Sequence, residues 1–150
     1  MNEPQSLKAV LGSIFLRRGR ETSRTKLFEN FPTSMQSSLL TSSITDPQEL
    51  PILASVLNSE HWVLITTSKI VDYRHGNPTS IACMLLEDAT VALGVDAMRG
   101  ATTKSELSSL KLKLYGKHDY LLEVESGPPY IGIWNVLKHF AVRNSPPTRE

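Results

Sequence analysis

The sequence has a single cysteine, Cys83, among its 150 residues. One thiol cannot form an intramolecular disulfide, so the disulfide framework that holds many small secreted domains together is excluded. A chain of this length can bury roughly two thirds of its unfolded surface, and its core therefore needs no such cross-link. A lone cysteine is typical of proteins in a reducing compartment, and we expect a cytoplasmic location.

Long apolar runs are also lacking. The apolar run near the N-terminus, residues 9–16, is too short to cross a bilayer. Its arginines follow the apolar part, whereas a signal peptide carries its positive charge first. We therefore expect neither a secretory signal nor a membrane partner.

Patterns of catalytic and metal-binding residues are missing as well. The four histidines, His61, His75, His118 and His139, are not at metal-ligand spacing from one another or from Cys83. The glycines are scattered and form no phosphate-binding loop. We predict no catalytic residue, metal site or cofactor, and an enzyme is the least supported class.

The small net charge of +1 conceals an uneven distribution. Residues 1–26 contain six basic and two acidic side chains, a charge of +4, which leaves −3 on the rest of the chain. This basic arm could bind an anionic partner, but we expect it to dock on the acidic body or to be solvated. Without interleaved aromatic residues, and with a pI near 7.9, nucleic acid is not an expected partner.

The stretch from His61 to Tyr73 predicts the centre of a sheet. Its β-branched and aromatic residues suit a pleated surface, and both faces are apolar at the middle. The sequence Thr67-Ser68-Lys69 interrupts the run, which indicates a strand, a tight turn and a returning strand.

The N-terminal segment predicts helices. Leu7, Val10, Leu11, Ile14 and Phe15 recur at helical spacing, which indicates an amphipathic helix from about Pro4 to Arg18 that docks on the body through this stripe. A short helix is predicted from Pro32 to about Leu40, and one helical turn over residues 46–49.

Strands and turns are predicted for most of the remaining chain. Further strands are predicted over residues 52–57, 80–85 and 90–93, with a bend at 86–88 and a long loop at 96–108. Alternating leucines indicate a hairpin formed by residues 110–115 and 120–125. After a break at 126–129, helical spacing indicates a final helix over 130–142, and residues 144–150 form a tail.

Three segments in this order resemble bacterial pleckstrin-homology-like (PH-like) domains. Residues 62–71 are similar to their strand–Thr-x-x–strand core, residues 80–88 to the strand before their sheet-crossing bend, and residues 130–140 to their capping helix. The resemblance implies an α+β fold: an antiparallel barrel or sandwich of about seven strands, capped by the C-terminal helix and preceded by a helical extension. It divides the chain into a helical arm (1–45), a PH-like domain (46–143) and a tail (144–150).

The resemblance implies a non-enzymatic binding role. Phosphoinositide-binding members have basic residues between their first two strands, whereas residues 58–60 here contain Glu60 and no base. Small free-standing chains of this kind resemble bacterial immunity proteins, which neutralise a partner toxin by covering it. On this hypothesis an acidic surface meets a basic partner protein through Glu87, Asp88, Asp119, Glu123 and Glu125. The alternatives are a small-molecule or lipid pocket between barrel and C-terminal helix, and a homodimer formed through the N-terminal helix.

Overall fold

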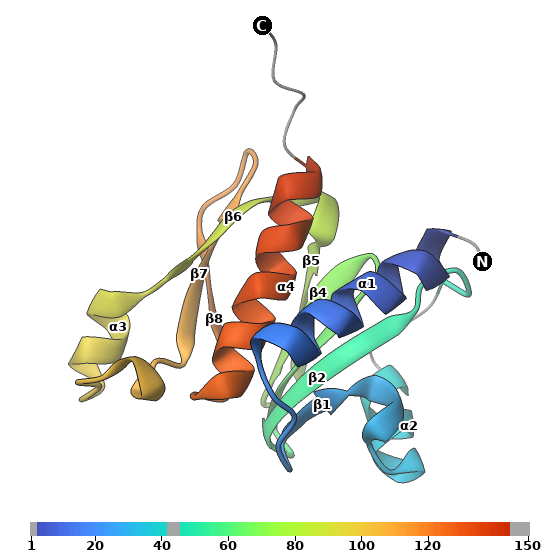
Figure 1. Cartoon of the computed structure of the whole chain (residues 1–150), viewed down its shortest axis with the longest axis horizontal. Helices are drawn as coiled ribbons and strands as arrows, with labels where there is room; N and C mark the ends of the chain where they lie inside the picture. The colour runs from blue at the N-terminus through green and yellow to red at the C-terminus, as the bar shows by residue number, and fades with distance from the viewer. Residues whose placement is uncertain (1–2, 42–45, 145–150) are drawn as a thin grey trace, which may run out of the picture.

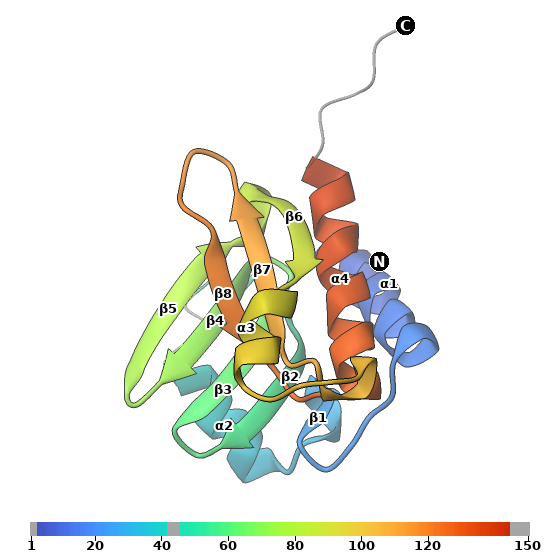
Figure 2. The same cartoon turned by 90° about the vertical axis from the view of Figure 1, so that its left-hand side faces the viewer.

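The computed structural model describes residues 3–41 and 46–144, and these residues form an α+β fold with two antiparallel sheets. Sheet A contains β1 to β5 in sequence order, and sheet B contains β6, β7 and β8. Figures 1 and 2 show the two sheets as separate layers with a long C-terminal helix beside them. The predicted α+β class is confirmed, with eight strands rather than about seven and with no closed barrel among the described residues.

The predicted central hairpin forms the middle of sheet A. Sheet A has four consecutive antiparallel strands, β2 (Pro51–Asn58), β3 (His61–Thr66), β4 (Lys69–Arg74) and β5 (Asn77–Ala82), and the predicted hairpin is β3 with β4. Residues 62–66 are all buried, as expected for a strand covered on both faces. The turn before β5 requires two residues with positive φ, His75 at 50° and Gly76 at 83°, a conformation that glycine adopts without strain.

Strand β1 (Thr25–Leu27) was not predicted, because three residues are too few to show an alternating pattern. It pairs with β2 at Ser55, Ala54 and Leu53 and forms one edge of sheet A. The buried Thr25 hydroxyl hydrogen-bonds to Ser55 Oγ at 3.0 Å, which allows a polar residue to enter the sheet. The segment assigned to the helical arm therefore also supplies a strand.

The bend between the sheets lies earlier than predicted. Strand β5 begins at Asn77, and a short 3-10 helix, η2 (Cys83–Leu85), makes the bend, so that β6 (Leu86–Val91) covers the predicted bend at 86–88. The strand was predicted to begin after Pro78. Strand β5 lies at the edge of sheet A, however, where proline is tolerated because its missing N–H is not needed. The predicted helical turn at 46–49 is only a hydrogen-bonded turn, in which the Glu49 N–H donates to the Asp46 carbonyl at 3.0 Å.

Sheet B contains β6 and the predicted leucine hairpin. Its strands β7 (Ser109–Leu114) and β8 (Tyr120–Glu123) pair as expected, although β8 ends before Glu125. The predicted loop at 96–108 instead contains the second half of α3 (Leu93–Met98) and the 3-10 helix η3 (Lys104–Glu106). Tertiary hydrogen bonds favour this structure: the buried Asp96 carboxylate accepts the N–H groups of Ser108 and Ser109, each at 3.2 Å.

Helix α4 runs from Pro128 to Asn144 and is longer at both ends than predicted. Proline is favoured in the first turn of a helix, where its missing N–H would have no helical partner. Asn144, assigned to the tail, donates from its side chain to the Cys83 and Leu86 carbonyls at 2.6 and 2.9 Å. The other tail residues, 145–150, lie outside the described residues, as do residues 42–45 of the predicted arm.

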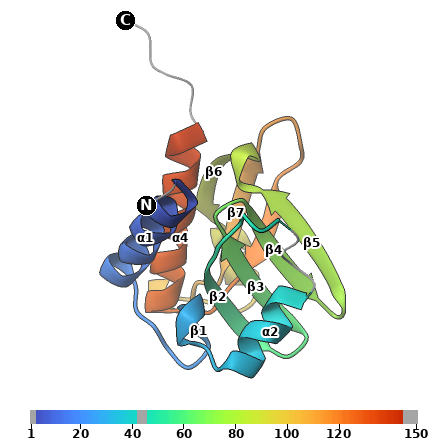
Figure 3. The ribbon, with the colours of Figure 1, turned by 90° about the vertical axis from the view of Figure 1, so that its right-hand side faces the viewer.

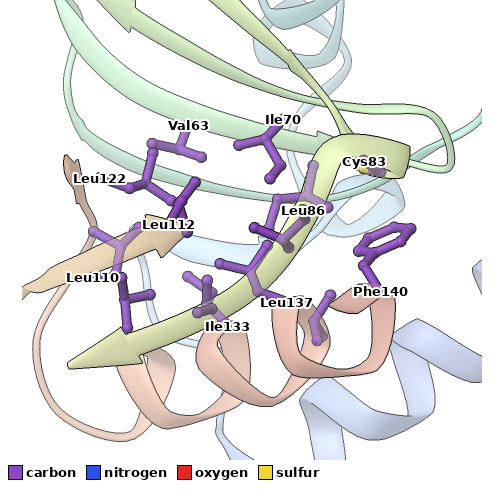
Figure 4. Close-up of a cluster of buried hydrophobic side chains, with 14 of the residues drawn as sticks. Val63, Ile70, Cys83, Leu86, Leu110, Leu112, Leu122, Ile133, Leu137 and Phe140 are labelled. Carbon is purple, nitrogen blue, oxygen red and sulfur yellow. The ribbon is translucent and has the colours of Figure 1, made fainter. Parts of the chain in front are cut away.

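The main core lies between the two sheets and α4 (Figure 4). It is built from inward-facing aliphatic residues of both sheets and from one face of the helix, and it includes Val63, Ile70, Leu86, Leu110, Leu112, Leu122, Ile133, Leu137 and Phe140. Burial of these apolar side chains is the main source of folding free energy.

Helix α1 (Glu3–Arg18) docks on α4 and joins this core, as its stripe predicted. Leu11 and Phe15 are fully buried, whereas Val10, also assigned to the stripe, is 44 % exposed. Glycines allow the close approach of the helices: a Cβ on Gly132 would lie 2.7 Å from Phe15 Cδ1. The N-terminal helix and the sheets therefore share one core.

Helix α2 (Thr33–Thr41) covers the outer face of sheet A (Figure 3). A second apolar cluster forms there from Phe28 and Phe31, from Leu39 of the helix, and from the sheet residues Ala54, Trp62, Leu64 and Val71. The rings of Trp62 and Tyr73 stack across two strands, with centroids 4.7 Å apart. This cluster covers the second face of the central strands.

Candidate functional site

Two of the predicted partner-binding acids lie on β6, and both are paired within the molecule. Glu87 lies 3.9 Å from Lys113 Nζ, and Asp88 accepts a 2.7 Å hydrogen bond from Lys138 Nζ of α4. The Lys138 hydrogen bond lowers the pKa of Asp88. Each of these carboxylates therefore already has a lysine partner within the molecule.

The other three acids lie in different surroundings. Glu123 of β8 pairs with Arg99 beside α3 at 3.3 Å. Glu125, expected on the partner-binding surface, is half-buried and accepts the Thr22 and Thr25 hydroxyls, each at 2.6 Å. Asp119 is exposed in the β7–β8 turn. The structure therefore does not bring the five acids together as one free acidic surface.

Four unpaired arginines lie at the end of α1 and in the connection that follows it. Arg17, Arg18, Arg20 and Arg24 are all exposed, and within residues 3–41 and 46–144 none of their side chains forms an ion pair or hydrogen bond. The sequence predicted that the basic arm docks on the body or is solvated: the helix docks, and these arginines are exposed to solvent. Among the arm's bases, Lys8 is paired, with Glu29 at 3.7 Å.

A groove of about 750 Å³ runs between α1 and sheet A. Small residues of α1, namely Ala9, Gly12 and Ser13, form one wall, and Leu27, Leu50 and Ile52 line the opposite side. Figure 1 shows α1 lying beside β1 and β2, the elements that bound this groove. The arrangement leaves a mostly apolar surface open to a ligand.

The two ends of the groove differ in charge. Lys8 and Glu29 lie at one end and neutralise each other. Leu16, which is 49 % exposed, and the unpaired Arg17 lie toward the other end. The chain that follows Arg17 leads into β1 and carries Arg20 and Arg24, which are both exposed. An exposed apolar surface next to concentrated charge is typical of an interaction site.

The alternative pocket between the sheets and α4 finds little support. That space is filled by the side chains of the main core, among them Ile133, Leu137 and Phe140, all at most 4 % exposed (Figure 4). The indole N–H of Trp134 donates to the Ala89 carbonyl at 2.7 Å, which fixes the helix on sheet B. A filled interior counts against a small molecule or lipid beneath this helix.

A buried polar cluster joins the sheets at a second place, and the sequence interpretation missed it. The Asp72 carboxylate is fully buried and accepts the Tyr120 hydroxyl at 2.6 Å and Arg74 Nε at 3.1 Å. His61 Nε2 lies 3.9 Å from the same carboxylate and has no hydrogen-bond partner. One signal could have revealed the cluster: Asp72 shares a strand face with Ile70, so it points inward. We interpret the cluster as a link between sheets A and B.

The Tyr120 hydroxyl provides a test of this cluster. Burial, and then the adjacent Asp72 carboxylate, raise the pKa of Tyr120 to about 12 from its ordinary value of 10.0. The tyrosine therefore stabilises the fold below pH 10, and this contribution disappears as the pH rises toward 12. In Asp72→Asn we expect the pKa to fall toward 10, measured as phenolate absorbance relative to a matched Tyr120→Phe protein. An unchanged pKa would show that the carboxylate has no influence.

The lone cysteine and the candidate metal ligands complete the chemical groups of interest in the described residues. Cys83 is buried, and burial together with the Glu49 carboxylate raises the pKa of its thiol, which keeps it protonated. In the described part of the chain, no three His, Cys, Asp or Glu side chains are grouped as metal ligands. None of the helices described here is both long and apolar enough to cross a membrane.

No known protein family, curated protein or solved structure matches this chain. Its function must therefore be inferred from the contacts, burial and charges of its own residues. Among these, the groove beside α1 is the feature best suited to binding.

Proposed function

We propose that this chain is a non-enzymatic protein-binding domain with a variant of the PH-like fold, and that its contact surface is the groove between α1 and sheet A. Two antiparallel sheets followed by a C-terminal helix support the PH-like assignment. The single cysteine supports a cytoplasmic location. No catalytic residue belongs to this proposal.

The observation that carries the proposal is the open apolar groove itself. Leu16 remains 49 % exposed beside Gly12, Leu27 and Ile52, and covering the exposed half of such a side chain is worth about 1 kcal/mol. A partner segment bound in the groove would bury Leu16 together with Leu27 and Ile52, and the complex would gain this free energy. Recognition of a helix or strand in a groove is a recurrent way for proteins to bind peptides.

A finer proposal is that the partner is a toxin and that the chain is an immunity protein. It is tested by co-expressing the chain with the product of a toxin gene encoded beside it. Survival of cells that the toxin alone would kill is the expected result, and their death despite a folded, abundant chain would contradict this version. The proposed groove would still be testable with other partners.

Filling the groove is expected to abolish binding. In Ser13→Trp the indole replaces an exposed serine on the groove wall, so it occupies the site while the core remains intact. Peptides would be selected from a displayed library of random 12-residue sequences on the immobilised full chain. We expect their affinity, measured by fluorescence anisotropy, to fall about tenfold or more, since burying the apolar anchor contributes over 1.4 kcal/mol.

Val10→Trp is the matched control for this experiment. Val10 lies on the same helix, is 44 % exposed and does not line the groove. The selected peptides should bind this variant as they bind the wild type. If Ser13→Trp also keeps full affinity, or if the library yields no peptide that competes for the groove, the proposed contact surface is wrong.

A further inference from the structure

We infer that the partner segment in this groove is acidic beside its apolar residues. This inference rests on the proposed function and adds the chemistry of the partner. It reverses the charge expected from the sequence, in which an acidic face of this chain was to meet a basic protein. The reversal follows from which charges are already paired in the folded chain.

The acidic side chains of the described residues are almost all satisfied internally. Seven of them form ion pairs: Glu3, Glu29, Glu49, Asp72, Glu87, Asp88 and Glu123. Five more accept hydrogen bonds: Glu21, Asp46, Asp96, Glu106 and Glu125. Only Glu60 and Asp119 in this part of the chain lack such a partner. Few of the described acids are therefore without an internal partner.

The arginines at the end of α1 and in the connection after it are in the opposite situation. Arg17 lines the groove, and Arg20 and Arg24 follow in the connection from α1 to β1, all exposed and unpaired. A guanidinium presents a planar set of donors that matches a carboxylate with two parallel hydrogen bonds. Carboxylates on the partner can therefore accept hydrogen bonds from these guanidinium groups, which are not paired with the acids of the described residues.

The length of the groove sets the distance between the partner's acidic contacts and its apolar contacts. From Lys8 to Arg17 the helix rises about 14 Å, which matches about nine residues of a helical partner or four of an extended one. Lys8 is already neutralised by Glu29. The partner's acids should therefore lie at the end of the groove that contains Arg17, and the partner's apolar residues should lie over Ile52 and Leu27.

A second copy of the chain is a poor candidate for this occupant. It would have to offer a segment with free acids beside exposed apolar side chains. In the part of the chain that the structure describes, the two unpaired acids, Glu60 and Asp119, both lie in turns between strands. A different protein supplies the segment more readily than self-association does.

The test uses the peptides selected on the full chain and a charge-reversed variant, Arg17→Glu/Arg20→Glu/Arg24→Glu. We expect the groove-dependent peptides to be rich in Asp and Glu beside Leu, Ile or Phe. Their dissociation constants should rise about tenfold or more on charge reversal, because three contacts become repulsive. Added salt should weaken peptide binding to the wild-type chain but not to the charge-reversed variant, since it screens the attraction between the arginines and the peptide's acids.

The matched control is Lys104→Glu/Lys111→Glu/Lys117→Glu, which changes the net charge equally at three unpaired lysines away from the groove. Unchanged affinity in this control locates the effect at the arginines. Peptides that need the groove but show no acidic bias and ignore arginine reversal would overturn this inference and leave the proposed function standing. Peptides indifferent to Ser13→Trp would overturn both. Arginine-dependent binding to phosphatidylserine vesicles, without any acidic peptide, would assign the arginines to a lipid surface instead and overturn the inference.

Discussion

Replacing Gly132 with alanine is expected to lower the free energy of unfolding by about 2 kcal/mol, because the new methyl group has no room. Its Cβ would lie 2.7 Å from Phe15 Cδ1 and 3.0 Å from the Phe15 carbonyl oxygen. The Phe15 ring is fully buried and cannot turn aside, so α1 and α4 must separate. Urea unfolding followed by circular dichroism measures the loss.

Gly12→Ala is the internal control for this prediction. Gly12 lies within α1, but its added Cβ would meet only Leu27 Cδ2, at an ordinary contact distance of 3.6 Å. Alanine is favoured over glycine inside a helix by about 1 kcal/mol, so this variant should be as stable as the wild type or more stable. Equal behaviour of the two substitutions would show that the helices are not in tight contact at Gly132.

Gly19→Ala extends the test to the other side of the crossing. Its Cβ would meet the Pro128 carbonyl oxygen at 2.7 Å and Gly132 Cα at 2.8 Å. Both are backbone atoms, which cannot move without shifting the start of α4. We therefore expect Gly19→Ala to destabilise the protein at least as much as Gly132→Ala does.

Removing the Asp72 carboxylate is the second change with a large expected effect. Asp72→Ala leaves the Tyr120 hydroxyl and Arg74 without their common acceptor in the link between the sheets. Loss of one partner from a buried ionic contact costs about 3 to 5 kcal/mol. We expect about 3 kcal/mol, because the Arg74 side chain is 40 % exposed and can turn to water. The measurement is again the free energy of unfolding in urea.

Tyr120→Phe separates the hydrogen bond from the charge. It removes the 2.6 Å bond to Asp72 but leaves Arg74 beside the carboxylate, so its cost should be smaller, about 1.5 to 2 kcal/mol. The double variant should lose less than the sum of the two single losses, because the two residues share one contact. Additive losses, or an Asp72→Ala protein as stable as the wild type, would contradict a role in joining the sheets.

The sequence predicted the elements whose residue pattern is local and long enough to read. The strand pair around Trp62 and Val71, the leucine hairpin after Ser109 and the final helix all form nearly as expected. Their side chains repeat every second residue, or every third and fourth, and burial of one face selects the matching structure. The short β1 and α3 were missed, because hydrogen bonds to Ser55 and from Ser108 and Ser109 stabilise them across the fold.

The candidate site could be predicted only in part. The sequence revealed the basic arm and its helix, but not that α1 would leave a groove beside Ile52 and Leu27. It suggested free acids at positions such as Asp88 and Glu125, which the fold instead pairs with Lys138 and with Thr22 and Thr25. The Asp72 cluster was also missed, because its partner Tyr120 lies 48 residues away.

By itself, the sequence determined the elements of this protein and its inventory of charges. Hydrophobic periodicity is a property of neighbouring residues, and it selects helix or strand wherever one face can be buried. The tertiary structure decided which charges are already paired and which remain available to a partner. Pairing depends on distances between residues far apart in the chain, such as Glu3 and Arg143, and packing of the core sets those distances. For this reason the binding surface that we propose is basic and apolar, although the residue pattern had indicated an acidic one.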